Sequence, residues 1–85
     1  MGRVRKSAVQ IRFEILEFLY YASRPQLRTH IWRKATTLAY DDFLKHLSYL
    51  ERAGLLEDVG DGRYRLTRKG RKIYDELRRS LPFIL

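Results

Sequence analysis

The stretch that most constrains the fold of this chain is YDDFLKHLSYLERAGLL, at residues 40–56. Phe43, Leu47 and Leu50 recur at helical spacing, which predicts a helix with one apolar face. Gly54 follows the periodic residues and is expected to end the helix, because glycine readily takes the left-handed conformation found at helix C-termini. We therefore expect this helix to pack its apolar face onto the core of the domain.

The opposite face of the same helix is lined by polar and amphipathic side chains, namely Tyr40, Asp42, Lys45, His46 and Tyr49. Side chains of this kind can contact base edges, so one interpretation places the helix in a DNA groove. The alternative is an ordinary amphipathic helix with a solvated outer face. Asp41 and Asp42 weaken the DNA interpretation because carboxylates repel phosphates, although one of them can accept a hydrogen bond from a cytosine amino group.

The charge of the chain narrows its expected partners. Its 18 Lys and Arg residues outnumber its 10 Asp and Glu residues, and the net charge of +8 favours nucleic acid or another anionic surface. The 85 residues fit one small domain, whose core would gain from dimerisation. Cysteine is absent, and no apolar run approaches the roughly 20 residues that span a bilayer. We therefore expect no membrane partner and a cytoplasmic, nucleoid-associated protein.

Residues 1–6 are expected to form a basic, flexible arm, because Arg3, Arg5 and Lys6 occur there without apolar periodicity. Such an arm can lie along phosphates or enter a minor groove. The alternative is a solvated chain end with no role in binding.

Ser7 followed by Gln10 is a capping-box signature, which predicts a helix over about residues 8–22. This helix has two apolar stripes. The first contains Ile11, Ile15, Phe18, Leu19 and Ala22, and the second contains Val9, Phe13, Leu16 and Tyr20. One small domain is expected to cover only one stripe, so the second stripe predicts a subunit interface. The alternative is that this helix is simply the central, most buried one.

Residues 23–28 contain Pro25 and are expected to form a turn and a short extended segment. Thr29 can cap a short helix over residues 30–35, and Leu38 is expected to be buried in the turn that follows. A short helix, a tight turn and a longer helix occur in the order that a helix-turn-helix requires.

Residues 55–66 predict a β-hairpin, with a tight turn at the glycine-rich residues 60–62. Arg63 and Arg65 alternate with apolar residues, which predicts a hairpin with a cationic outer face. The alternative is a short solvated hairpin whose arginines only keep the protein soluble.

Thr67 is expected to cap a C-terminal helix over about residues 68–80, followed by an apolar tail at residues 82–85. The first turns of this helix carry Arg68, Lys69, Arg71 and Lys72. Cations are unfavourable near a helix N-terminus, so local stability does not explain them and contacts with phosphate would. Simple solvation of these side chains is the alternative.

Two pieces of the sequence, AGLL at residues 53–56 and YRLTRKG at residues 64–70, resemble in order and spacing the archaeal winged helix-turn-helix DNA-binding proteins. That group includes small chromatin-associated proteins and transcriptional regulators. The similarity covers about residues 11–77. It implies a mainly helical α+β domain over residues 7–81, a winged helix-turn-helix with a three-helix core, a β-hairpin wing and a C-terminal helix.

The resemblance also implies a homodimer that binds double-stranded DNA, and we expect a sequence-specific transcriptional regulator. The helix from residue 40 would enter the major groove and the wing would lie on the backbone or minor groove. This assigns DNA contacts to Tyr40, Lys45, His46, Tyr49, Arg63 and Arg65. Charge adds Arg3, Arg5, Arg68 and Lys69 to the predicted DNA contacts. The dimer interface predicted from the second apolar stripe and the tail comprises Val9, Phe13, Leu16, Tyr20, Phe83, Ile84 and Leu85.

Two features depart from that family. Ala39 stands where relatives usually place a capping serine. The long C-terminal coiled-coil helix by which some relatives dimerise is not expected, since the sequence stops at Leu85. The predicted interface along the first helix, the last helix and the tail takes its place.

Two other functions stay open. One is a winged-helix protein-interaction module in a larger assembly, in which the acids of the 40–52 helix and the apolar tail would contact a protein. The other is a low-specificity chromatin protein with the same DNA contacts. An enzyme, a metal site and a cofactor are not expected, because His30 and His46 lie on different predicted helices and no nucleophile, base and pocket can be assigned together.

Overall fold

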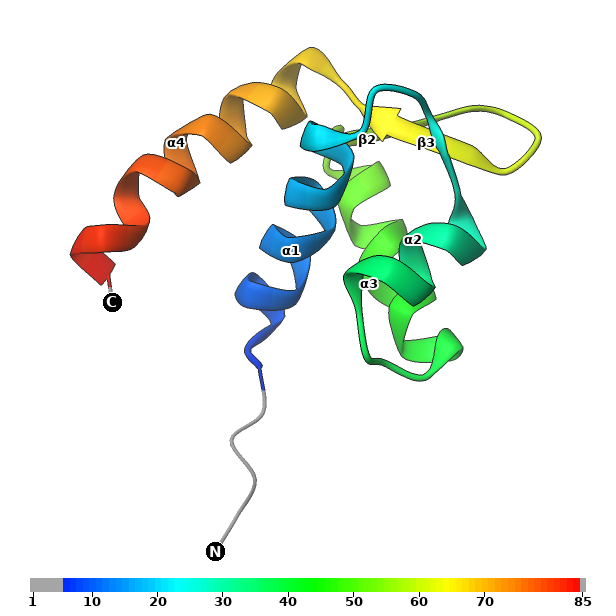
Figure 1. Cartoon of the computed structure of the whole chain (residues 1–85), viewed down its shortest axis with the longest axis horizontal. Coiled ribbons are helices and arrows are strands. Elements are labelled where there is room, and N and C mark those ends of the chain that lie inside the picture. The colour runs from blue at the N-terminus through cyan, green and yellow to red at the C-terminus, as the bar shows by residue number, and fades with distance from the viewer. Residues whose placement is uncertain (1–5, 85) are drawn as a thin grey trace, which may run out of the picture.

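The computed structural model of the protein describes residues 6–84, with side chains through residue 80. Its elements are α1 (Ala8–Tyr21), β1 (Gln26–Leu27), α2 (Arg28–Ala35), α3 (Tyr40–Arg52), β2 (Leu56–Gly60), β3 (Arg63–Leu66) and α4 (Arg68–Ile84). The first three helices form a body from which the β2–β3 hairpin and α4 extend in different directions (Figure 1). All of the predicted helices and the predicted hairpin are present. The predicted DNA contacts Arg3 and Arg5 lie outside the described residues.

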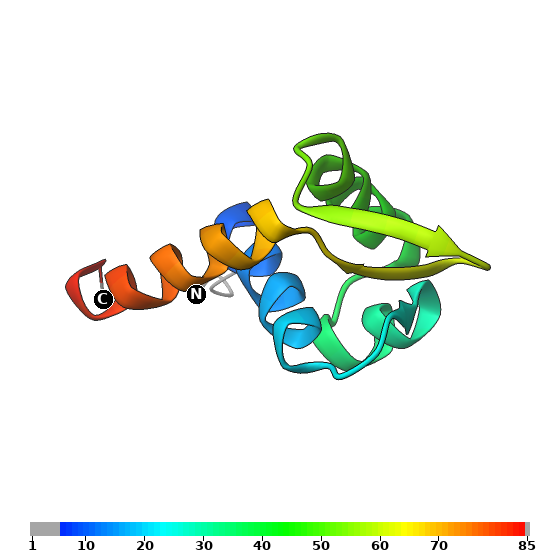
Figure 2. The ribbon, with the colours of Figure 1, turned by 90° about the horizontal axis from the view of Figure 1, so that it is seen from above.

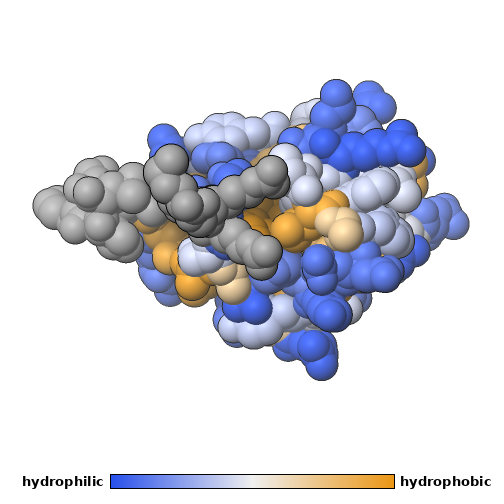
Figure 3. Space-filling view, turned by 90° about the horizontal axis from the view of Figure 1, so that it is seen from below, coloured by the Kyte–Doolittle hydropathy of each residue, from blue (hydrophilic) through white to orange (hydrophobic). Residues whose placement is uncertain are grey.

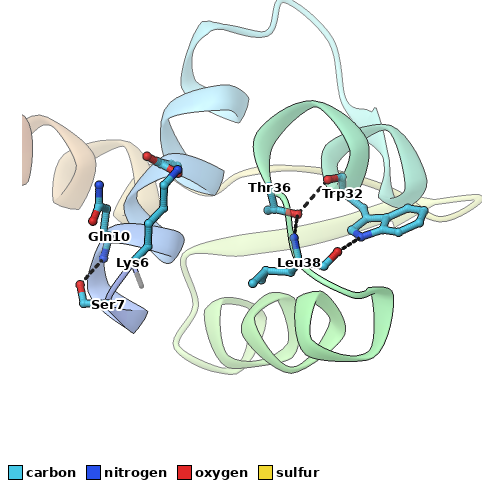
Figure 4. Close-up of polar contacts among 7 residues, drawn as sticks. Lys6, Ser7, Gln10, Trp32, Thr36 and Leu38 are labelled. Atoms are coloured by element: carbon cyan, nitrogen blue, oxygen red, sulfur yellow. Dashed lines mark hydrogen bonds and ion pairs between the residues drawn. The ribbon is translucent and has the colours of Figure 1, made fainter. Parts of the chain in front are cut away.

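α1 is the central helix of the body, because it contacts α2, α3, α4 and β3. Its first turn is capped by Ser7, whose Oγ accepts a hydrogen bond from the backbone N–H of Gln10 at 3.1 Å, as the capping signature predicts (Figure 4). Leu16 was expected at a subunit interface, yet it is only 2% exposed within the single chain. Leu16 belongs to the second apolar stripe, which was expected to stay uncovered in a single domain. That expectation is wrong for Leu16, because neighbours in the same chain surround this part of α1.

The apolar stripe of α3 is the centre of the core. Phe43, Leu47 and Leu50 are 0%, 3% and 1% exposed, which confirms the periodicity argument. Gly54 has a φ of +78° and ends the helix in the left-handed conformation, as expected. The start of α3 lacks a side-chain cap at Ala39, also as expected.

Hydrogen bonds from the end of α2 close the turn between α2 and α3. The indole Nε1 of Trp32 donates to the carbonyl of Leu38 at 2.7 Å, and Thr36 Oγ1 donates to the carbonyl of Trp32 at 2.8 Å (Figure 4). Leu38 packs against the core from the turn, as predicted, but it is half-buried and not fully buried. These bonds set the angle between the two helices of the helix-turn-helix.

The sheet has three antiparallel strands in the order β1-β3-β2. The extended segment before α2 therefore pairs with the hairpin, with Gln26 opposite Tyr64. This pairing moves the start of α2 to Arg28, whose N–H donates to the carbonyl of Gly62 at 3.0 Å. The predicted cap at Thr29 is wrong, because the N-cap position is Leu27 and no side chain caps the helix.

α4 begins after Thr67, whose Oγ1 accepts a hydrogen bond from the N–H of Gly70 at 3.0 Å, so the predicted cap is confirmed. Tyr74 is 1% exposed and joins this helix to the core. The helix continues to Ile84, beyond its predicted end near residue 80. Its later turns run away from the three-helix body (Figure 2).

Candidate nucleic-acid interface

The two sequence pieces that carry the resemblance, residues 53–56 and 64–70, meet in space. The N–H of Thr67 donates to the carbonyl of Leu55 at 3.1 Å, and its Oγ1 donates to the carbonyl of Gly54 at 2.6 Å. A Cβ on Gly70 would collide with the carbonyl oxygen of Leu55, so only glycine fits there without movement. These pieces join the end of α3, the start of β2 and the start of α4, and their role is to hold the fold together.

Lys69 takes part in the same joint. Its Nζ donates to the carbonyl of Ala53 at 2.9 Å, just beyond the last turn of α3. A cation at this position satisfies a free carbonyl and complements the negative end of the helix dipole. Lys69, which was predicted to contact DNA, therefore forms a hydrogen bond within the protein.

The outer face of α3 differs from the predicted set at several positions. Tyr40 is half-buried, with its ring 5.0 Å from that of Trp32 and 6.0 Å from that of Phe43, so it belongs to the packing of the α2–α3 turn. The solvent-exposed residues of the helix are Asp41, Asp42, Lys45, Ser48, Tyr49, Glu51 and Arg52. Ser48 and Arg52 were missed from the sequence, although they follow Lys45 at helical spacing and this periodicity could have identified them.

His46 and Tyr49 are held by a residue that the sequence analysis did not single out. The guanidinium carbon of Arg12, in α1, lies 3.6 Å from the centroid of the Tyr49 ring, and its Nε donates to Nδ1 of His46 at 3.3 Å. Burial, followed by the charge of Arg12, lowers the pKa of His46, while Asp42 acts in the opposite direction. Nδ1 of His46 accepts the hydrogen bond in this contact, and Arg12 ties the outer part of α3 to α1.

The hairpin is less cationic than predicted. Arg65 forms an ion pair with Glu57 on the neighbouring strand, with Nε and Oε2 2.9 Å apart. Asp58 and Asp61 add two further acids, so the hairpin at residues 56–66 carries three acidic and two basic side chains. The hairpin as a whole therefore has a net charge of −1, and on its outer face Glu57 offsets the charge of Arg65. Arg63 has no ion pair with any described residue.

The positive charge of the chain lies mostly outside α3 and the hairpin. Residues 40–66 contain four basic and six acidic side chains, a net charge of −2. Because the whole chain carries +8, the other residues together carry +10. Long-range attraction to an anionic partner must therefore come from the surfaces around these two elements.

One such surface, around β1 and α2, was missed in the sequence analysis. Arg24, Arg28, Arg33 and Lys34 are all exposed there. The side chain of Arg28 reaches to within 4.0 Å of the place that a Cβ on Gly62 would occupy, so it lies beside the hairpin turn. The sequence could have identified this surface, because no acidic residue occurs between Glu17 and Asp41.

A second cationic surface lies on α4. Arg68 and Lys72 are exposed there, and their contacts with phosphate stay a prediction. Arg71 instead lies over the ring of Tyr20, 5.5 Å from its centroid, and Arg78 donates to the hydroxyl of Tyr21 at 2.8 Å.

The predicted dimer residues fall into four groups, of which the buried Leu16 is one. Val9 is 65% exposed, whereas Phe13 and Tyr20 are half-buried against the ring of Tyr74, with centroids 5.1 and 4.5 Å apart. Hydrophobic side chains reach the surface on the underside of the molecule, beside the grey segments (Figure 3). The side chains of Phe83, Ile84 and Leu85 lie outside the described part of the chain.

The profile of the winged helix-turn-helix family matches residues 5–82 of this sequence. The chain belongs to the winged helix-turn-helix family. The predicted fold class is confirmed as a mainly helical α+β winged helix-turn-helix with four helices and a small three-stranded antiparallel sheet. This family typically consists of non-enzymatic, DNA-binding domains.

The winged helix-turn-helix fold is also similar to the crystal structure of the archaeal protein AF1382 from Archaeoglobus fulgidus. The TM-score is 0.69 and the sequence identity is 23%, over 86% of each chain. At this identity the likeness supports the fold alone. No curated protein matches the chain significantly.

The described residues include no group of three or more His, Cys, Asp or Glu side chains that could hold a metal ion. Across the same part of the chain, no helix is long and apolar enough to cross a membrane.

Proposed function

We propose that this winged helix-turn-helix protein binds double-stranded DNA as a homodimeric, sequence-specific transcriptional regulator. The observation that carries the proposal is the presentation of one exposed face of α3 next to a hairpin in a chain of net charge +8. α3 enters the major groove, and the wing lies on the backbone or the minor groove.

Within this proposal, α3 reads bases and its surroundings supply attraction. Lys45, Ser48 and Arg52 are exposed on α3 and reach base edges, together with Tyr49. Arg28 and Arg63 both lie beside the hairpin turn and take the nearest phosphates. Because α3 and the wing are net acidic, non-specific attraction depends on the other cationic surfaces, including those of α2, α4 and the arm.

The homodimer is proposed from the exposed apolar surface of α1 and the apolar sequence at the end of α4. Val9 and the half-buried Phe13 supply the α1 part. Two recognition helices that read one face of a duplex need a separation of about 34–36 Å, which the dimer has to provide.

A second candidate function is a protein-interaction module. The net charge of −2 over residues 40–66 favours it, because an acidic α3 and wing suit a basic protein surface better than phosphates. A low-specificity chromatin protein is a variant of the DNA-binding proposal with the same contacts and little sequence preference.

Fluorescence anisotropy with two labelled duplexes tests the proposal, one of random sequence and one from the DNA upstream of the gene, at several salt concentrations. A dimer with about 6–10 phosphate contacts should lose roughly 10³–10⁵ in affinity between 50 and 200 mM salt. Tighter binding to the upstream duplex at physiological salt supports a regulator, and equal binding to both duplexes supports the chromatin variant. Absence of binding at low salt would favour the protein-interaction module.

A further inference from the structure

An open groove of about 950 Å³ lies between the start of α1, the α2–α3 turn and the first turns of α3. Its apolar part is formed by Ile11, Ala35 and Leu38. Figure 4 shows two of its sides, with Lys6 next to α1 on one and Thr36 and Leu38 in the turn on the other. The volume is in the range of small-molecule sites, and the groove combines this apolar surface with a larger number of polar and charged side chains.

Arg12 is the cation that the fold orients in this groove. Its guanidinium stacks on the ring of Tyr49 at 3.6 Å, and its Nε is used in the hydrogen bond to His46. These contacts fix the guanidinium plane, and neither Nη group donates to an acceptor in the described part of the chain. A planar guanidinium with two free donors matches a carboxylate in a two-bond arrangement.

The other charges that line the groove are paired. Lys6 lies 2.7 Å from a carboxylate oxygen of Glu14, and Lys45 lies 4.0 Å from one of Asp42. Arg12 is therefore the one cation of the groove without an acidic partner among the described residues. An excess of one positive charge suits a singly charged anion better than a doubly charged phosphate.

We propose that this groove binds a small amphipathic monocarboxylate, whose carboxylate pairs with Arg12 and whose apolar body lies on Ile11 and Leu38. The bound molecule contacts α1, the turn and α3 together, so it favours one position of α3 relative to α1. Its effect on DNA affinity rests on the proposed function, whereas its binding to the protein does not.

NMR titration of the ¹⁵N-labelled full chain, without DNA, tests the binding. Three probes are compared. Benzoate has both a carboxylate and an apolar body. Benzamide has the same shape without the charge, and inorganic phosphate has charge without the apolar body. The reporters are the Nε–H of Arg12 and the indole N–H of Trp32, the single tryptophan, which donates to the carbonyl of Leu38. Benzoate should shift both signals saturably with a Kd on the order of 1 mM, and the other two probes should bind roughly tenfold more weakly or not at all.

Arg12→Gln should weaken benzoate binding roughly tenfold or more, while the matched control Arg24→Gln, at an exposed arginine outside the groove, should leave it unchanged. If Arg12→Gln does not fold, Arg12→Lys replaces it, since lysine retains the charge without the two-bond geometry. Equal shifts with benzamide, or unchanged benzoate binding in the folded variant, would overturn the proposal.

The DNA-binding role is tested separately by anisotropy of the same variants. Loss of DNA affinity in Arg12→Gln together with no benzoate shift in the natural protein would make Arg12 a phosphate contact and would also overturn the carboxylate site. A benzoate shift in a protein that does not bind DNA would support the site and contradict the proposed function alone.

Discussion

The hydroxyl of Tyr74 in α4 donates a hydrogen bond to Oε2 of Glu17 in α1 at 3.1 Å, across 57 positions of sequence. Tyr74 is 1% exposed, and its ring stacks with that of Phe13 and lies tilted against that of Tyr20. This contact sets the direction in which α4 leaves the domain. The direction matters for function, because the proposed dimer interface lies along α1 and α4.

Tyr74→Phe should retain the ring packing and remove the hydroxyl. We expect a loss of about 0.5–1.5 kcal/mol in the free energy of unfolding, because one hydrogen bond is removed. Tyr74→Ala should cost about 3–5 kcal/mol, because it also leaves a cavity. Urea denaturation of both variants measures the difference, and equal losses would contradict the tight packing of the ring.

The same residue predicts a loss of stability at alkaline pH. Burial, followed by the hydrogen bond with Glu17, raises the pKa of Tyr74 above its ordinary value of 10.0. The folded state therefore resists ionisation, and this contribution is complete below pH 10 and lost as the pH rises through the folded-state pKa. The natural protein should lose about 1.4 kcal/mol more than Tyr74→Phe for each pH unit in that window.

Urea denaturation of both proteins between about pH 9 and pH 11 measures this effect, because the range spans the ordinary tyrosine pKa of 10.0. Tyr20 and Tyr64 also have a raised pKa, but they are common to both proteins and cancel in the comparison. Parallel pH curves would show that Tyr74 does not ionise differently in the folded and unfolded chains.

Gly70→Ala should destabilise the protein, although alanine in place of glycine inside a helix ordinarily stabilises by about 1 kcal/mol. The added Cβ meets the carbonyl of Leu55, and relieving that collision should cost about 1–3 kcal/mol. Thermal unfolding should show a decrease of roughly 4–8 °C per kcal/mol for a domain of this size. Ser48→Ala, at an exposed position of α3, is the control and should leave the melting temperature nearly unchanged.

Arg28→Glu and Arg63→Glu should each weaken DNA binding, because these side chains lie at the hairpin turn in the proposed complex. We expect roughly a tenfold loss at low salt and a reduction of about 0.9 in the slope of log affinity against log salt for each phosphate contact removed. Arg79→Glu makes the same change of charge on the outer end of α4 and should have a smaller effect.

Unchanged DNA affinity in the Arg28 and Arg63 variants, with the dimer intact, would favour the protein-interaction module. Loss of affinity to the same extent in Arg79→Glu would indicate that net charge, and not the hairpin surface, governs binding. Size-exclusion chromatography with light scattering checks the oligomeric state of each variant.

Asp41→Asn with Asp42→Asn should strengthen binding to random DNA and reduce the preference for the upstream duplex. The two carboxylates repel phosphates and, in the proposed complex, accept hydrogen bonds only from particular bases. The variant should also lose about 0.3–1 kcal/mol of stability for each acid, since carboxylates favour a helix N-terminus. Anisotropy with both duplexes measures the preference, and an unchanged ratio would remove these acids from base recognition.

The candidate site could be predicted from sequence only where local spacing determines exposure. Lys45 and Tyr49 lie on the outer face of α3 because they oppose the buried Phe43 and Leu47. The partner of a charged side chain follows no such spacing. Arg12 could not be placed under Tyr49, since 37 residues separate them in sequence and α1 and α3 come together only in the folded chain.

The sequence by itself determined the order of helices and strands, their caps at Ser7 and Thr67, and the apolar stripe of α3, because these depend on neighbours within one or two turns. Tertiary structure alone decided that Leu16 is buried and that Lys69 and Arg65 have partners in the protein. Burial and ion pairing depend on which surfaces meet, and the packing of α4 and the hairpin onto the helices brings together residues that are distant along the chain.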